Sequence, residues 1–268
     1  MLLNNLALLD YRHYYENNMI RRGLDLYLPP DYDFSNKYVP LDPLSSVTFD
    51  NQEKYPPEYD DLIRLHYAVT KCKALTVVEI GSGSSTSVIA HAVSINMQDI
   101  GDISNLRKPY SGKVFTVDTS EFWLNETLKS IPANLHDCIF PIVSGCSTHL
   151  IDDRIATLFD NFPNISADFY YIDGPHNMDS IGSVSGQSTR DPSRMPMIAD
   201  LIISEFFLHP GCIIYVDGRT ANARFMKHCF KQNWIYKHYN ELDVHIFELT
   251  EESLGIFNTR DLIKRGLA

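Results

Sequence analysis

The chain has 268 residues, 44% of them apolar, and a formal net charge of -11 at pH 7. An apolar share of this size can form a full core, which excludes an intrinsically disordered chain, and the acidic balance argues against nucleic acid or an anionic membrane as the main partner. The five cysteines are scattered without a CxxC pair, which disfavours a disulfide framework and a cysteine zinc site and favours a cytoplasmic protein.

Residues 1–60 form one compositional zone, rich in tyrosine and broken by six prolines. We interpret this N-terminal extension as a cap, a lid or a dimerisation segment, so a homo-oligomer is one expectation. A helix is expected at about residues 5–22. The start of the chain lacks a basic region and includes Asp10, so it resembles neither a signal peptide nor a membrane span. Residues 57–74 then carry apolar side chains at helical spacing, which predicts a second helix.

Residues 61–250 form the predicted main domain, and residues 251–268 a C-terminal tail. From Leu75 onward, short apolar runs without polar alternation are typical of a parallel sheet covered on both faces. The predicted strands are TVVEIG, KVFTVD, CIFPIVSG, DFYYIDG and CIIYVDG. The predicted crossover helices are STSVIAHAVSINM, SEFWLNETLKSI, STHLIDDRIATLF and MIADLIISEFFL. Finally, NWIYKHY and VHIFELT are separated only by NELD, which predicts an antiparallel hairpin at one edge of the sheet.

Polar residues follow the first two predicted strands, at the edge where parallel sheets bind ligands. Glu79 precedes a turn whose two glycines allow a close backbone approach, and the next helix offers free N–H groups. Thr86 replaces the third glycine of a dinucleotide fingerprint, and Glu79 favours a cationic group over a pyrophosphate. Asp118 follows 39 residues after Glu79 and can accept both hydroxyls of a ribose. The alternatives are a turn that needs glycine only for its geometry and a solvated loop aspartate. The residues of the turn are Gly81, Ser82, Gly83, Ser84 and Ser85.

The later strand ends also carry candidate functional residues. Cys146 and Ser147 belong to a small-residue turn that can lie against a flat base. Asp173 and His176 share a Gly/Pro turn, and histidine is well suited to accept a proton near neutral pH. Asp217 is expected near Asp173, and two facing carboxylates can hold Mg²⁺. The alternatives are a solvated loop histidine and hydrogen-bonded loop acids.

Two arginines, Arg219 and Arg224, follow the fifth strand. They either recognise a phosphate or carboxylate on a substrate or, as their spacing favours, form ordinary surface ion pairs.

These motifs resemble a known family. VVEIGSGSST is similar to the first motif of class I S-adenosylmethionine (SAM)-dependent methyltransferases, and DFYYIDGPHN and GCIIYVDGR are similar to their small-molecule O-methyltransferase branch. The resemblance covers about residues 60–250. It implies an α/β, Rossmann-like, doubly wound sheet of seven strands in the order 3-2-1-4-5-7-6, with O-methylation of a small-molecule or sugar hydroxyl as the activity.

The resemblance also implies roles for the site residues. Glu79 and the residues Gly81 to Ser85 would surround the methionine part of SAM, Asp118 would hold the ribose, and Cys146 and Ser147 would border the adenine. Asp173 would lie beside the methyl-transfer centre.

The chain departs from the family's metal-dependent members, because Gly218 follows Asp217 where they have Asp or Asn. This departure shifts the interpretation towards metal-free catalysis, with His176 as the general base and Asp173 orienting its ring. The insert MDSIGSVSGQSTRDPSRMP is expected in the acceptor pocket or a lid. The rival hypotheses are a nicotinamide-dependent oxidoreductase and a non-catalytic protein that binds SAM or a nucleotide.

Overall fold

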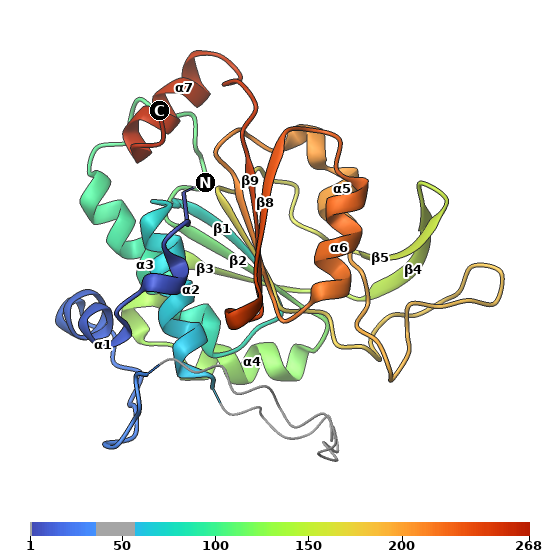
Figure 1. The fold of residues 1–268 in the computed structure, drawn as a ribbon, viewed down its shortest axis with the longest axis horizontal. Coiled ribbons are helices and arrows are strands. Elements are labelled where there is room, and N and C mark those ends of the chain that lie inside the picture. The colour runs from blue at the N-terminus through green and yellow to red at the C-terminus, as the bar shows by residue number, and fades with distance from the viewer. Residues whose placement is uncertain (1, 36–56) are drawn as a thin grey trace.

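The computed structural model describes residues 2–35 and 57–268, in which a seven-stranded sheet forms the centre of the molecule (Figure 1). The strand order is β3-β2-β1-β6-β7-β9-β8, and the first five of these strands are parallel. Counted within this sheet alone, the order is the predicted 3-2-1-4-5-7-6, with the predicted antiparallel hairpin at one edge. The strands are β1 (Thr76–Ile80), β2 (Lys113–Asp118), β3 (Ile139–Val143), β6 (Phe169–Ile172), β7 (Ile213–Asp217), β8 (Trp234–Tyr239) and β9 (Val244–Leu249).

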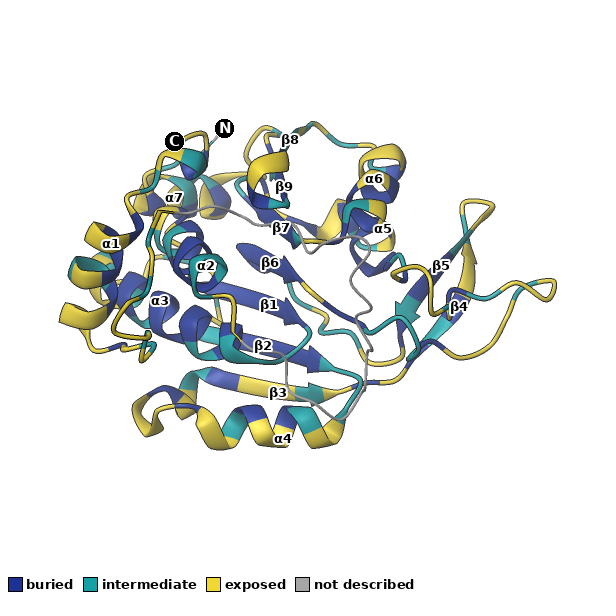
Figure 2. Cartoon of the chain, turned by 60° about the horizontal axis from the view of Figure 1, so that its bottom comes forward, coloured by how far each residue is buried: buried dark blue, intermediate teal, exposed yellow. Residues whose placement is uncertain are grey.

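Helices cover both faces of this sheet, which explains why its strands are almost uniformly apolar. Successive strand residues point to opposite faces, so Val77 packs in the core under α2 (Tyr59–Lys71) and α3 (Ser84–Ile100), whereas Val78 packs in the core under α5 (Asp200–Ile203) and α6 (Thr220–Cys229). The helix α4 (Glu121–Ser130) lies beside β3 (Figure 2). The predicted helices at α2, α3 and α4 are thereby confirmed.

The prediction of a third crossover helix was wrong. The stretch STHLIDDRIATLF lies in an antiparallel hairpin of β4 (Cys146–Ile151) and β5 (Arg154–Phe159), which forms a separate sheet. Asp152 and Asp153 both adopt left-handed backbone conformations, with φ of 47° and 61°, as a two-residue hairpin turn requires. The hairpin extends beyond the carboxyl ends of the parallel strands (Figure 2).

The fourth predicted helix is much shorter than expected. It forms only α5 and a 3₁₀ turn (Glu205–Phe207). The hydroxyl of Ser204 donates to the carbonyl of Asp200, and the buried carboxylate of Glu205 accepts from the N–H groups of Lys231 and Gln232. These side-chain contacts compete with a continuous helix.

The N-terminal segment is helical in pieces rather than as the one helix predicted at about residues 5–22. Its tyrosines and Met19 pack against α2 and α3. Residues 36–56 of the predicted extension lie outside the described residues. The pieces are 3₁₀ turns at Leu6–Leu8 and Ile20–Arg22, α1 (Tyr11–Tyr14) and a π-helical turn at Tyr15–Met19.

Two buried histidines join this N-terminal segment to α2 and α3. His91 Nε2 lies 3.0 Å from the carbonyl oxygen of Arg22, so this nitrogen must donate and His91 Nδ1 must accept. His66 Nε2 therefore donates to His91 Nδ1 over 2.9 Å, and the hydroxyl of Tyr14 donates to His66 Nδ1 over 2.8 Å. Burial lowers the pKa of both histidines, so both rings are neutral in the folded protein.

The predicted C-terminal tail contains α7 (Ile256–Arg265), which docks at the amino side of the sheet. Buried Arg265 pairs with Asp168, just before β6, over 3.0 Å and with Asp261. Lys108 pairs with the same two carboxylates. The remaining 3₁₀ turns are Ala133–Cys138 and Asn240–Leu242.

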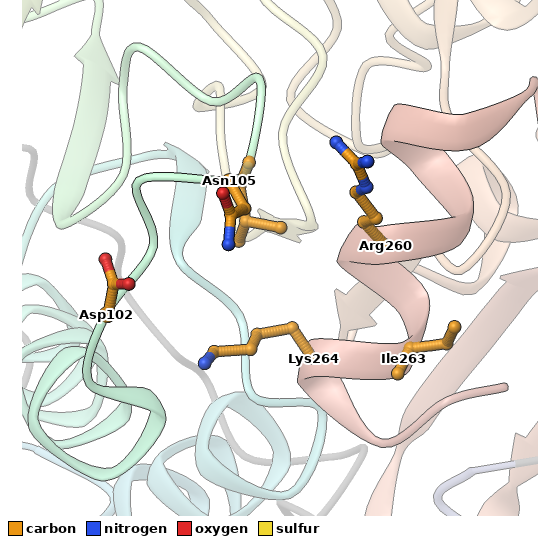
Figure 3. A pocket seen from close by; sticks show the side chains of 6 residues that line it. Asp102, Asn105, Arg260, Ile263 and Lys264 are labelled. Atoms are coloured by element: carbon orange, nitrogen blue, oxygen red, sulfur yellow. The ribbon is translucent and has the colours of Figure 1, made fainter.

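A pocket of about 290 Å³ lies between α7 and the loop after α3. Arg260, Ile263 and Lys264 line it from α7, and Asp102 and Asn105 line it from the loop (Figure 3). The pocket is therefore on the side of the sheet opposite to the strand ends where the candidate functional residues lie. Among the described helices, none has the length and apolar character needed to cross a membrane.

Candidate functional site

The sequence-predicted residues meet at the carboxyl edge of the parallel strands. Ile80 at the end of β1 pairs with Val117 of β2 and with Ile172 of β6, and Ile172 pairs with Val216 of β7. The residues that follow these paired positions therefore lie side by side at one edge. They are Gly81, Asp118, Asp173 and Asp217.

The turns after β1 and β6 touch backbone to backbone. A Cβ at Gly174 would lie 2.9 Å from the nitrogen and 3.0 Å from the Cα of Gly81, and Gly81 has a φ of +93°. Both positions therefore require glycine for the fold itself. Gly83 differs, because its φ of 172° is extended and a Cβ there would meet no atom within 4 Å. The space beside Gly83 is open at the start of α3.

Glu79 has no exposed surface and lies beneath this turn. Its carboxylate accepts hydrogen bonds from the hydroxyls of Ser85, Thr86 and Thr116 over 2.6, 2.7 and 2.8 Å. Burial raises its pKa to about 7, against the lowering effect of these three donors. The Thr86 hydroxyl also accepts from the N–H of Gly83. The residue that replaces the third fingerprint glycine therefore connects Glu79 to the turn, a role that the motif alone did not reveal.

Asp118 is partly exposed and holds the turn from the side of β2. One of its oxygens accepts from the Ser82 N–H over 2.8 Å and from the Ser82 hydroxyl over 2.5 Å, and the other accepts from the Ser120 N–H over 2.8 Å. A carboxylate has about four acceptor positions, so one remains open and a ligand hydroxyl can replace that of Ser82.

Cys146 and Ser147 begin β4 rather than a turn before a helix. Cys146 is buried, and burial raises the pKa of its thiol to about 12, so it is a neutral, small wall residue. Ser147 is partly exposed, with its hydroxyl 2.9 Å from His149 Nε2. Both residues stand where the β4–β5 hairpin leaves the sheet.

Asp179 joins the two sides of the site, although the sequence analysis did not identify it. Its carboxylate accepts from the hydroxyl of Thr119, after β2, over 2.6 Å and from the N–H of His176, after β6, over 3.0 Å. Because β2 and β6 flank β1, this contact crosses the end of β1. Asp179 lies in an irregular insert, where no periodic pattern signals a contact.

Asp173 and Asp217 form a pair of interacting carboxylates. The side chain of Asp173 reaches solvent, but protein surrounds it on its other sides, and this desolvation and the charge of Asp217 raise its pKa. Partly buried Asp217 accepts from the Tyr171 hydroxyl over 2.8 Å, and burial raises its pKa too. In the described part of the chain, no third histidine, cysteine or carboxylate completes a metal-ligand cluster with these two. The Mg²⁺ site remains a prediction.

His176 is partly exposed, but its ring is already engaged. Its Nδ1 is 3.3 Å from the N–H of Met178, so Nδ1 accepts and the proton of the neutral ring lies on Nε2. In this tautomer Nε2 has no lone pair for a substrate proton. Among the described contacts, the hydrogen bonds of His176 involve Met178 and Asp179, not Asp173.

Arg219 is buried, so the expected surface ion pair is wrong at this position. Its guanidinium donates to the carbonyls of Asp173, Pro175 and Pro196 over 3.3, 2.9 and 3.2 Å. Burial lowers its pKa to about 10. Arg219 thus connects the turn that carries Asp173 to the end of the insert, whereas Arg224 is exposed.

A network of buried hydroxyls joins the insert to the β4–β5 hairpin. Thr148 and Thr157 of the hairpin meet Ser180 and Thr189 of the insert at distances of 2.8 to 3.2 Å, and within the insert Thr189 donates to Ser180 over 2.7 Å. Backbone contacts support the network, since the N–H of Thr148 donates to the carbonyl of Ile181. Hairpin and insert therefore form one rigid wall beside the site.

Comparison with known proteins gives weak matches. No family model and no curated protein matches the chain. Among solved structures, the O-methyltransferase TomG from Streptomyces achromogenes, in complex with SAM, is 15% identical over 74% of this chain and 82% of its own, with a TM-score of 0.40. An O-methyltransferase from Bacillus cereus, in complex with SAH, is 15% identical over 75% and 85%, with a TM-score of 0.42. The methyltransferase PaMTH1 of Podospora anserina, bound to SAH, is 11% identical over 73% and 80%, with a TM-score of 0.43.

The evidence for the fold is the strand order of this chain itself. With five parallel strands and an antiparallel closing hairpin in this order, the chain has a Rossmann-like α/β fold. The fold does not determine the activity, which has to be argued from the site.

Proposed function

We propose that this protein is a SAM-dependent methyltransferase that methylates a hydroxyl group of a small molecule or sugar. The observation that carries the proposal is that the Gly81–Ser85 turn, Asp118 and Asp173 lie at one edge of a sheet with this strand order. SAM is a nucleoside joined to an amino acid, and it requires an open glycine backbone, the start of a helix and an acceptor for its ribose hydroxyls.

The residues present fit this cofactor. The open side of Gly83 admits a ligand against the backbone, and the first turn of α3 presents N–H groups to the carboxylate of the methionine part. Asp118 accepts from the ribose hydroxyls after exchanging the hydroxyl of Ser82. Cys146 and Ser147 border the base with small side chains. Glu79 acts through its contacts with the helix start and contributes its negative charge from below.

When bound, SAM supplies a methyl group on a positively charged sulfur. The protein must then position an acceptor oxygen, remove its proton and exclude water. Positioning contributes about 7–11 kcal/mol of barrier lowering, and a general base a further 10²- to 10⁴-fold.

Asp173 is the better candidate for the base in the structure as it stands. It is exposed, and its raised pKa makes the ionised carboxylate a stronger proton acceptor than an ordinary aspartate. His176 acts as a base only after its proton moves to Nδ1, which breaks the contact with Met178. The wall formed by the β4–β5 hairpin and the insert is the proposed acceptor side.

The cytoplasm is the proposed location, because all five cysteines are free thiols and suit a reducing compartment. The acceptor is proposed to be a small molecule, since the chain carries no basic run for a nucleic acid.

Calorimetric titration with S-adenosylhomocysteine, with and without Mg²⁺, tests the cofactor assignment. We expect binding that Asp118→Asn weakens at least tenfold and that Asp153→Asn, at the hairpin tip, leaves unchanged. Absence of binding, or equal affinity in Asp118→Asn, would refute the assignment. NAD binding in its place would favour an oxidoreductase, and SAM binding without turnover over a broad acceptor panel would favour a non-catalytic protein.

A further inference from the structure

The hairpin β8–β9 carries three metal-binding side chains that have no part in the proposed methyl transfer. One ligand atom from each of His238, Asp243 and His245 lies within 4.8 Å of the other two. We propose that these residues form a binding site for a divalent transition metal ion of the zinc class.

The backbone fixes the three positions before any ion binds. His238 and His245 are paired directly across the two strands, so their side chains share one face of the sheet. Asp243 lies at the turn between the strands in a left-handed conformation, with φ of 47°. Its carbonyl oxygen accepts from the N–H of Gly218 over 2.9 Å, which ties it to the turn after β7.

The contacts of the two imidazoles indicate which of them can move. The rings stack with centroids 3.8 Å apart and planes at 16°. The hydroxyl of Thr220 lies 3.0 Å from His245 Nε2 and that of Tyr236 lies 2.9 Å from Nδ1, so the buried ring of His245 is held on both sides. The Nε2 atom of His238 is buried and has no hydrogen-bond partner in the described part of the structure. An unpartnered buried nitrogen is unfavourable, and a metal ion would satisfy it.

Binding requires local adjustments, the first of which is that the hydroxyl of Thr220 or of Tyr236 leaves one nitrogen of His245. Two ligands at about 2.1 Å from one ion lie at most about 4.2 Å apart, so the longest separation here must shorten by less than about 1 Å. Parallel rings direct their lone pairs side by side, so one ring must turn. His238, partly exposed on the edge strand β8, is the ring with space to turn.

The donor set selects the class of ion. Two imidazoles and one carboxylate suit zinc and related transition metals, whereas Mg²⁺ prefers oxygen ligands alone.

An ion at this position would crosslink the two strands of the β8–β9 hairpin beside their turn. The carbonyl of Asp243 already accepts from the N–H of Gly218, the residue after β7, so the fixed turn lies next to the carboxyl end of that strand. The ion would therefore stabilise the hairpin without touching SAM or its acceptor.

Metal titrations on protein without a histidine tag test the proposal. We expect one Zn²⁺ per chain by calorimetry, and visible ligand-field absorption when Co²⁺ is bound instead. His238→Ala and Asp243→Asn should each weaken Zn²⁺ binding at least tenfold. His228→Ala, which removes an exposed histidine of α6, should leave it unchanged.

The proposal would be overturned if the wild-type protein does not bind Zn²⁺, or if both ligand variants bind it as strongly as wild type does. The second result would point to the cysteines as ligands. Titrating the same samples with S-adenosylhomocysteine separates this proposal from the proposed function. If His238→Ala and Asp243→Asn lose Zn²⁺ binding but still bind S-adenosylhomocysteine, the metal site is supported. If the wild-type protein binds Zn²⁺ but not S-adenosylhomocysteine, the proposed function fails and the metal site stands.

Discussion

Acidification should destabilise the protein through His66, the fully buried histidine between Tyr14 and His91. Burial lowers its pKa well below the usual 6.5, so the folded protein keeps the ring neutral while the unfolded chain takes up a proton. The stability that the neutral ring confers is present above pH 6.5 and is lost as the pH falls below that value. Between pH 7.5 and 5.5, one histidine that protonates only in the unfolded chain costs about 1.4 kcal/mol.

The comparison must be made between variants, because other groups titrate in the same range. Glu79, whose pKa is raised to about 7, has the opposite effect and stabilises the folded protein as the pH falls. Urea unfolding of wild type and His66→Gln at both pH values isolates the histidine. The variant should lose about 1.4 kcal/mol less than wild type on acidification, whatever its absolute stability.

The exposed His13 provides the matched control. His13→Gln should show the pH dependence of the wild-type protein. If His66→Gln shows it too, the ring is protonated in the folded state and the hydrogen-bond chain derived from Arg22 is incorrect.

Three further predictions concern the site. Gly174→Ala should lower the free energy of unfolding by about 1–3 kcal/mol, because the new Cβ meets the backbone of the turn after β1. Gly83→Ala should leave stability unchanged and weaken only S-adenosylhomocysteine binding. Equal thermal stability of Gly174→Ala and wild type would contradict this reasoning. Asp173→Asn should reduce turnover at least tenfold, and more than His176→Ala does, with cofactor affinity nearly intact in both; a larger loss in His176→Ala would restore the histidine as base. Arg219→Lys should increase proteolysis within the insert, since one ammonium cannot reach three separate carbonyls, and unchanged cleavage would argue against that role.

The parallel sheet could be predicted because its strands are buried on both faces and therefore lack polar alternation. The closing hairpin could be predicted because four residues cannot form a crossover. The β4–β5 hairpin was missed, because the apolar spacing in STHLIDDRIATLF also fits a helix. Adjacent Asp152 and Asp153 were the available signal, as aspartate tolerates the left-handed conformation that such a turn needs.

Within the site, the positions of residues were easier to predict than their contacts. Strand ends place Asp118 and Asp173 at one edge whatever the loops do. The tautomer of His176 depends on one backbone N–H two residues away, and the contact of Asp179 with Thr119 depends on the path of an irregular segment. Neither of these two features follows from a residue spacing that can be recognised in the sequence.

The shared hydroxyl network has a practical consequence for redesigning the acceptor range. Replacing the β4–β5 hairpin alone would leave the hydroxyls of Ser180 and Thr189 only each other as partners and would remove the Thr148 acceptor of the Thr189 N–H, and an unsatisfied buried group costs about 1–3 kcal/mol. Residues 148–159 and 178–197 therefore have to be transplanted together, while Cys146 and Ser147, which border the proposed base site, stay in place. A chimera that exchanges both segments can keep the glycine turn and Asp118 untouched, so new acceptor chemistry can be grafted onto an unchanged nucleoside side.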